Sequence, residues 1–291
     1  TIGYNRWGLF QAVQGGYLWK GLMSIGSTSS VDFRDSNRVI SIADTPRTYA
    51  AFNKIEINNA SSRVDWTNIS ISALNESGLS RGALEVVDDA DVNFDGCTFT
   101  GMNTFSFLAN STVLNTTFRR CNAVTVTTGS IVGSRFDSPT VAADGAALIY
   151  NQTQNPDGYF DDTSFTKGTN DHHAIEFGAS APTTITLRGI DFSGFSGTAN
   201  AATLNFLRTS GTTTVNLVGC SGTITAKVTG THTVTFVTNP VTVDVHVQNI
   251  NTRASIQGAC VYVIAAAIGP QPFEDTVLIT STRVTAPMSP T

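Results

Sequence analysis

The segment Asn93-Phe94-Asp95-Gly96-Cys97-Thr98-Phe99 is the clearest copy of a phrase that occurs six times between residues 90 and 222. Each copy closes on Phe, or on Gly in the last case. A small or apolar residue stands two places before the closing residue, and an apolar residue stands five places before it. The closing residues are Phe99, Phe118, Phe136, Phe165, Phe192 and Gly222. They are separated by 19, 18, 29, 27 and 30 residues, so the period is loose.

Repeats of this length that are built from short strands predict a solenoid, because one repeat cannot bury its apolar face alone. A loose period favours a parallel β-helix, in which a turn can lengthen at a loop without disturbing the strands that stack. Leucine-rich repeats need Leu and Asn at fixed places, and ankyrin or tetratricopeptide repeats need helical periodicity. The sequence has neither pattern.

A second short, β-prone segment lies between successive phrases, so each coil is expected to run strand, turn, strand, turn. These segments are 83–87, 104–108, 123–126, 147–150, 174–177 and 204–207. The closing Phe residues are expected to form an inner ladder. Cys97 and Cys220 share an inward column and are expected to be buried, without forming a disulfide.

The fold class expected is all-β: a right-handed parallel β-helix followed by a small β-sandwich-like segment. Residues 1–82 are assigned to an N-terminal cap and irregular first coils, and residues 83–238 to the β-helix body. Apolar and polar residues alternate strictly at the start of residues 239–291, which predicts a small immunoglobulin-like or transthyretin-like β segment, either complete or incomplete.

The composition excludes several functions. Charged residues make up 13% of the chain, against about a quarter in an average protein, and the net charge is −5. A nucleic-acid surface is not expected, since no basic run occurs. Membrane insertion is not expected either, because the longest apolar run, residues 260–268, is too short to span a bilayer. No Cys/His metal spacing or cofactor motif is present, so neither a metal nor a cofactor is expected.

Carboxylate pairs are the only catalytic signal. Glycoside-cleaving enzymes use two acids about 5 Å or about 6.5–9.5 Å apart, and adjacent strands lie about 4.8 Å apart. Acids on neighbouring coils therefore reach a suitable separation. The strongest candidates are Asp95, Glu85, Asp161, Asp162 and Glu176. The competing interpretation is ordinary turn chemistry, because Asp is common at corners.

A few side chains are candidates for binding a ligand. Tyr150 and Tyr159 are placed where they would line a surface groove, and His172 and His173 precede a strand. The alternative for the two histidines is a surface loop without a role in binding. His232 and His246 stand at polar positions of alternating strands and are expected to be exposed.

The coils of residues 83–237 resemble the right-handed parallel β-helix of the pectate-lyase-like superfamily, which includes bacteriophage tail spikes. The phrases at 31–40 (VDFRDSNRVI) and 111–121 (STVLNTTFRRC) resemble phage structural proteins. The resemblance implies a virion structural protein: a spike, fibre or capsid-associated appendage on the phage particle. It also implies a homotrimer that contacts other virion proteins and host surface polysaccharide.

Two other functions remain open at this point. One is a spike that binds or cleaves glycans, as a hydrolase or a lyase. The other is a secreted bacterial β-helix adhesin, which would be extracellular. No family-defining catalytic motif is matched, so the resemblance predicts the fold better than it predicts an activity. A function without catalysis is therefore favoured over an enzyme.

Overall fold

The computed structural model describes strand backbones between residues 9 and 57, and then residues 59–73, 83–86 and 90–239 apart from 104, 108–109, 128 and 198. The chain divides into two units, Thr1–Asn239 and Pro240–Thr291. Everything described belongs to the first unit. The predicted β segment beyond Asn239 and the side chains of the predicted cap lie outside the described residues.

The described residues are all-β, as predicted, apart from one 3-10 turn at Ala199–Ala201. Four sheets contain the strands, and each strand pair is parallel except β1 with β2. The ten-stranded sheet contains β1 (Leu9–Val13), β2 (Gly16–Lys20), β5 (Val39–Ile42), β8 (Ser70–Ala73), β11 (Thr98–Thr100), β14 (Thr117–Arg119), β17 (Arg135–Asp137), β19 (Ser164–Thr166), β22 (Asp191–Ser193) and β25 (Ser221–Gly222).

The other three sheets complete the unit. The nine-stranded sheet contains β3 (Met23–Ile25), β6 (Lys54–Ile57), β9 (Ala83–Val86), β12 (Phe105–Phe107), β15 (Val124–Val126), β18 (Ala146–Tyr150), β20 (His173–Phe177), β23 (Leu204–Phe206) and β26 (Ala226–Val228). The five-stranded sheet contains β4 (Ser30–Phe33), β7 (Arg63–Thr67), β10 (Asp91–Asp95), β13 (Ser111–Leu114) and β16 (Ser130–Val132). The three-stranded sheet contains β21 (Thr184–Arg188), β24 (Thr212–Val218) and β27 (Thr233–Thr238).

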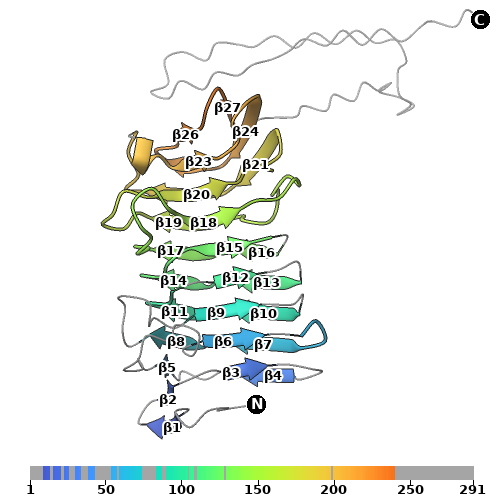
Figure 1. Ribbon diagram of the computed structural model, residues 1–291, viewed down its shortest axis with the longest axis vertical. Helices are drawn as coiled ribbons and strands as arrows, with labels where there is room; N and C mark the ends of the chain where they lie inside the picture. The colour runs from blue at the N-terminus through green and yellow to red at the C-terminus, as the bar shows by residue number, and fades with distance from the viewer. Residues whose placement is uncertain are drawn as a thin grey trace, which may run out of the picture. The chain divides into compact units, whose positions relative to one another are not determined.

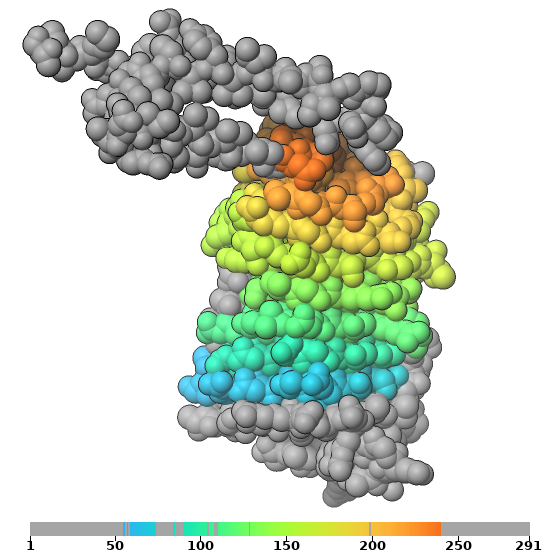
Figure 2. Space-filling view, turned by 180° about the vertical axis from the view of Figure 1, so that it is seen from behind, coloured from blue at the N-terminus to red at the C-terminus, as the bar shows by residue number. Residues whose placement is uncertain are grey.

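Strand order within every sheet follows the order of the chain. Apart from the β1–β2 hairpin, the chain forms at least one strand in another sheet before it returns to pair with its own earlier strand, and Figure 1 shows the strands advancing in this way. The same sequence order is visible from behind as successive bands of colour (Figure 2). Parallel strands need such crossover connections, because a tight hairpin joins only antiparallel neighbours.

The predicted ladder of closing residues is confirmed, residue for residue. Phe99, Phe118, Phe136, Phe165 and Phe192 are consecutive register partners in the ten-stranded sheet, and Gly222 follows them. All five rings are buried. Their centroids lie 4.7–5.6 Å apart in stacked pairs. Aromatic stacking thus connects one repeat to the next through the interior.

The expected coil of two strands is wrong, because the recurring phrase spans two strands in every copy except the one at residues 161–165. β10 and β11, for example, are separated only by Gly96 and Cys97. The residue three places before each closing residue has a positive φ, which turns the chain sharply between the strands. These corner residues are Gly96, Asn115, Gly133, Asp162, Gly189 and Gly219, and Asn68 holds the same place before Ile71, the register partner of Phe99. Only Gly, Asn and Asp occupy them, which are the residues that tolerate this conformation.

Backbone hydrogen bonds continue around the corners. The amide of Gly96 donates to Leu114 O at 3.1 Å, that of Asn115 to Val132 O at 3.0 Å, and that of Gly133 to Asp161 O at 2.9 Å. Neighbouring repeats therefore stay paired where the strands end.

The predicted second segments all lie in the nine-stranded sheet. Their inward residues form two further buried columns that face the aromatic ladder. The first column is Phe105, Val124, Leu148, Ile175 and Leu204. The second is Phe107, Val126, Tyr150, Phe177 and Phe206. Cys97 is buried as expected, Cys220 is half-buried, and both are free thiols.

Candidate functional site

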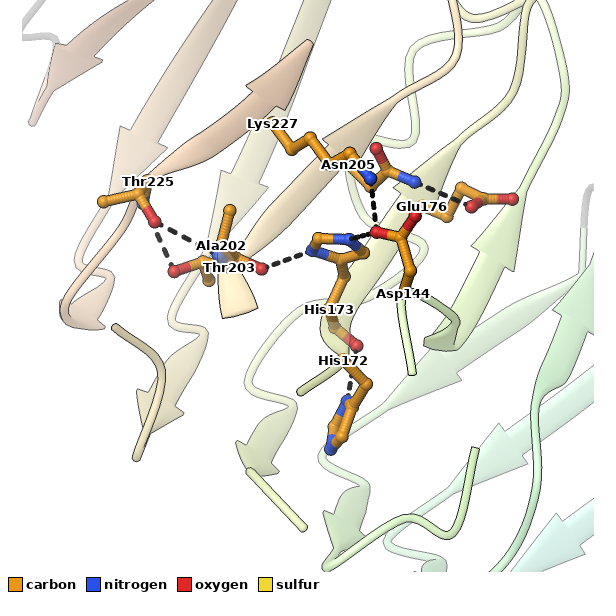
Figure 3. Close-up of polar contacts among 9 residues, drawn as sticks. All are labelled: Asp144, His172, His173, Glu176, Ala202, Thr203, Asn205, Thr225 and Lys227. Atoms are coloured by element: carbon orange, nitrogen blue, oxygen red, sulfur yellow. Dashed lines mark hydrogen bonds and ion pairs between the residues drawn. The ribbon is translucent and has the colours of Figure 1, made fainter. Parts of the chain in front are cut away.

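A group of polar side chains gathers around three outward positions of the nine-stranded sheet. Glu176, Asn205 and Lys227 are register partners on β20, β23 and β26. Asp144 reaches them from the loop before β18, and His173 begins β20 (Figure 3). We call these five residues the outer cluster. Glu176, Asn205 and Lys227 alternate with the inward positions of their strands, whereas His173 has the parity of the inward Ile175 and Phe177 and is itself buried.

Asp144 is the centre of the outer cluster. Its Oδ1 lies 3.1 Å from His173 Nε2 and also forms an ion pair with Lys227 Nζ. The other ring nitrogen of His173, Nδ1, lies 2.6 Å from the carbonyl oxygen of Ala202. A carbonyl can only accept, so Nδ1 carries a proton and donates. Each nitrogen of this fully buried ring therefore faces an oxygen acceptor.

The two basic partners hold the Asp144 carboxyl in its ionised form. Its pKa is lowered, first by the hydrogen bond from Lys227 and then by the one from His173. Beside this group, Asn205 Nδ2 donates to Glu176 Oε2 at 2.9 Å. Asn205 is 3% exposed, and its Oδ1 has no hydrogen-bond partner among the described residues.

The expectation that His172 and His173 lie on a surface loop is wrong, because both side chains are fully buried. His172 Nδ1 lies 2.9 Å from His173 O, and His172 Nε2 accepts from the amide of Gly168 at 2.9 Å. Accepting at Nε2 requires the neutral ring, and burial lowers the pKa of His172. His232 was expected to be exposed and is buried as well. His246 lies outside the described residues.

We expect the stability of the protein to fall as the pH drops below the usual histidine pKa of 6.5. The pKa of His172 is lower in the folded chain, so its contribution is present above 6.5 and is lost as the pH falls through the folded value. Urea unfolding at about pH 7.5 and about pH 5.5 measures this loss. The variant His172→Gln keeps an acceptor for Gly168 and cannot titrate, so the loss should be smaller. An equal loss in both proteins would contradict this account.

The predicted carboxylate candidates are spread over different edges of the unit. Asp95 ends β10, is exposed and accepts from Asn115 Nδ2 at 3.0 Å. Asp162 is an exposed corner residue. The side chain of Glu85 lies outside the described residues. Glu176 belongs to the outer cluster, on a different sheet from Asp95.

Asp161 lies in the segment that bridges the five-stranded and three-stranded sheets. Its carbonyl accepts from Gly133, and the next residue donates to Arg188 O, so the backbone pairs on both sides without forming a strand. Burial and then the charge of Asp157 raise the pKa of Asp161. Arg188 forms a two-point ion pair with Asp157, at 2.6 and 3.1 Å.

Tyr150 does not line a surface groove, as was expected, because it belongs to an inward column and is fully buried. Its hydroxyl donates to Gln154 O at 3.2 Å, and burial raises its pKa to about 12. Tyr159 is half-buried and packs edge-on against Tyr150, with ring centroids 6.3 Å apart. Neither ring offers an open stacking platform of the kind that was predicted for sugar binding.

Sequence reasoning missed Asp144, Asn205 and Lys227. Two of these had a detectable signal, since aligning the second segments on their apolar residues places Asn205 and Lys227 in the column of Glu176. Asp144 had none, because it lies in a loop and is 83 residues from Lys227.

Comparisons of the chain with protein families, with curated proteins and with solved structures found no match. In the part of the chain that the structure describes, no three or more His, Cys, Asp or Glu side chains gather so as to hold a metal ion. No helix among the described residues is long and apolar enough to cross a membrane.

Proposed function

We propose that this chain is a virion structural protein whose first unit is a right-handed parallel β-helix, as in a phage spike, fibre or capsid-associated appendage. The observation that carries the proposal is the unbroken register from Phe99 to Gly222, with hydrogen-bonded corners between the strands. Such a body is stiff, because every interior strand pairs on both edges. Stiffness and resistance to proteolysis are what a particle appendage requires.

The position on a phage particle and the homotrimer rest on the resemblance of the repeated phrases to phage structural proteins. The structural role is favoured over catalysis because the acids that lie close together are engaged in internal contacts. Asp144 pairs with Lys227 and His173, Glu176 with Asn205, and Asp157 with Arg188.

Mass spectrometry of purified particles from the source material tests the proposal. The chain should be found in the particles in multiple copies, and mass photometry of the isolated protein should give three chains per assembly. Its absence from particles would overturn the virion assignment. In parallel, incubation with host polysaccharide should produce no new reducing ends and no unsaturated uronates. Their appearance would favour the glycan-cleaving alternative instead.

A further inference from the structure

The outer cluster connects parts of the chain that are far apart in sequence. Asp144 precedes β18, His173 begins β20, Ala202 precedes β23, and Lys227 lies within β26. The contacts among these residues therefore touch four consecutive strands of the nine-stranded sheet. Asp144 and Lys227 are 83 residues apart in the sequence.

This connection lies at the end of the nine-stranded sheet that β26 forms. β26 pairs with β23 and has no further partner among the described strands. Val228 continues the inward column of Phe177 and Phe206, yet it is 41% exposed. Terminal strands with little buried apolar surface open at a lower free energy than the core of a fold. The apolar contacts of β26 alone are therefore weak.

We propose that Asp144, His173 and Lys227 form a clasp that holds β23 and β26 against β18 and β20. The charges explain why the clasp acts as one unit. A single carboxylate satisfies both Lys227 and the buried His173, so its loss leaves two polar groups without their partner. Releasing the clasp opens this end of the unit while the earlier repeats stay folded.

Hydrogen exchange of the full chain, followed by mass spectrometry, tests the clasp. The variant Asp144→Asn preserves the size of the side chain and removes its charge. We expect amide exchange in β23 and β26 to accelerate about tenfold or more, because hydrogen bonds to charged groups contribute about 1.5–3 kcal/mol. Exchange in β13 and β14 should not change. The matched control is Asp157→Asn, whose carboxylate is about as exposed (41%) as that of Asp144 (46%). Its partner Arg188 is 44% exposed, whereas His173 is fully buried, so the control should have little effect.

A second variant keeps the proposal falsifiable if Asp144→Asn also affects folding. Lys227→Met removes the other end of the clasp, and should accelerate exchange in the same two strands. Because both changes break one contact, the double variant should show less than the sum of the two effects. The clasp would be refuted by fully additive effects, by faster exchange in all strands alike, or by an Asp144→Asn variant that behaves like Asp157→Asn.

Discussion

Replacing Phe136 with alanine is expected to lower the free energy of unfolding by about 3–5 kcal/mol. The ring is 1% exposed and is stacked between Phe118, at 5.0 Å, and Phe165, at 4.7 Å. The cavity left behind cannot collapse, because backbone hydrogen bonds fix the spacing of β14, β17 and β19 on both sides. Much of the total stability of a domain would be lost in one substitution.

Arg135 offers a matched control, since it precedes Phe136 in β17 and its side chain points outward, with 56% exposed. Arg135→Ala should change the stability by no more than about 0.5 kcal/mol. Chemical denaturation followed by circular dichroism measures both variants. Similar effects of the two substitutions would show that the interior ladder does not stabilise the fold.

Gly133→Ala is expected to destabilise the fold through a single added methyl group at a corner. Gly133 has φ +60°, and a Cβ there would lie 2.8 Å from Asn115 Oδ1 of the preceding repeat. The backbone strain alone costs about 1–3 kcal/mol, and the steric overlap adds to it. The same arrangement recurs at Gly96 beneath Asn68 and at Gly189 beneath Asp162.

Asn115→Gly should partly rescue Gly133→Ala, because it removes the atom that the new methyl group meets. The two changes should therefore couple by about 0.5 kcal/mol or more in a double-mutant cycle, measured by chemical denaturation. Asn115→Gly alone should cost little, since its amide group is exposed and donates one hydrogen bond to Asp95. Strictly additive effects would show that the two corners do not touch.

The register of the aromatic ladder could be predicted from sequence because the closing Phe of each phrase can be aligned whatever the number of residues between copies. Insertions between Phe136 and Phe165 lengthen loops, yet the rings still meet at 4.7 Å. The third strand, which the repeats have except the one around Asp161, was missed. Gly96 and Cys97 separate β10 from β11, and the buried positions change phase there, from Val92 and Phe94 to Cys97 and Phe99. The odd spacing was visible in the repeated phrase, but the phrase was interpreted as one strand.

The candidate site was less predictable, because parts of the chain that are distant in sequence determine how exposed its side chains are. Contacts from Gly168, Ala202 and Asp144 accompany the burial of His172 and His173, and none of these positions is marked in the local sequence. Tyr150 differs from them, since strand alternation with Leu148 already indicated its inward position.

The central claim is that successive repeats stack in register along the unit. Nitroxide labels on keto amino acids, placed at the outward positions Ser70, Ser164 and Ser221, allow electron–electron resonance distances without changing the native cysteines. Ser164 and Ser221 lie four and six register steps from Ser70. At about 4.8 Å per step, the distances should be about 19 Å and about 29 Å. Equal distances, or a shorter one to Ser221, would contradict the stacked arrangement.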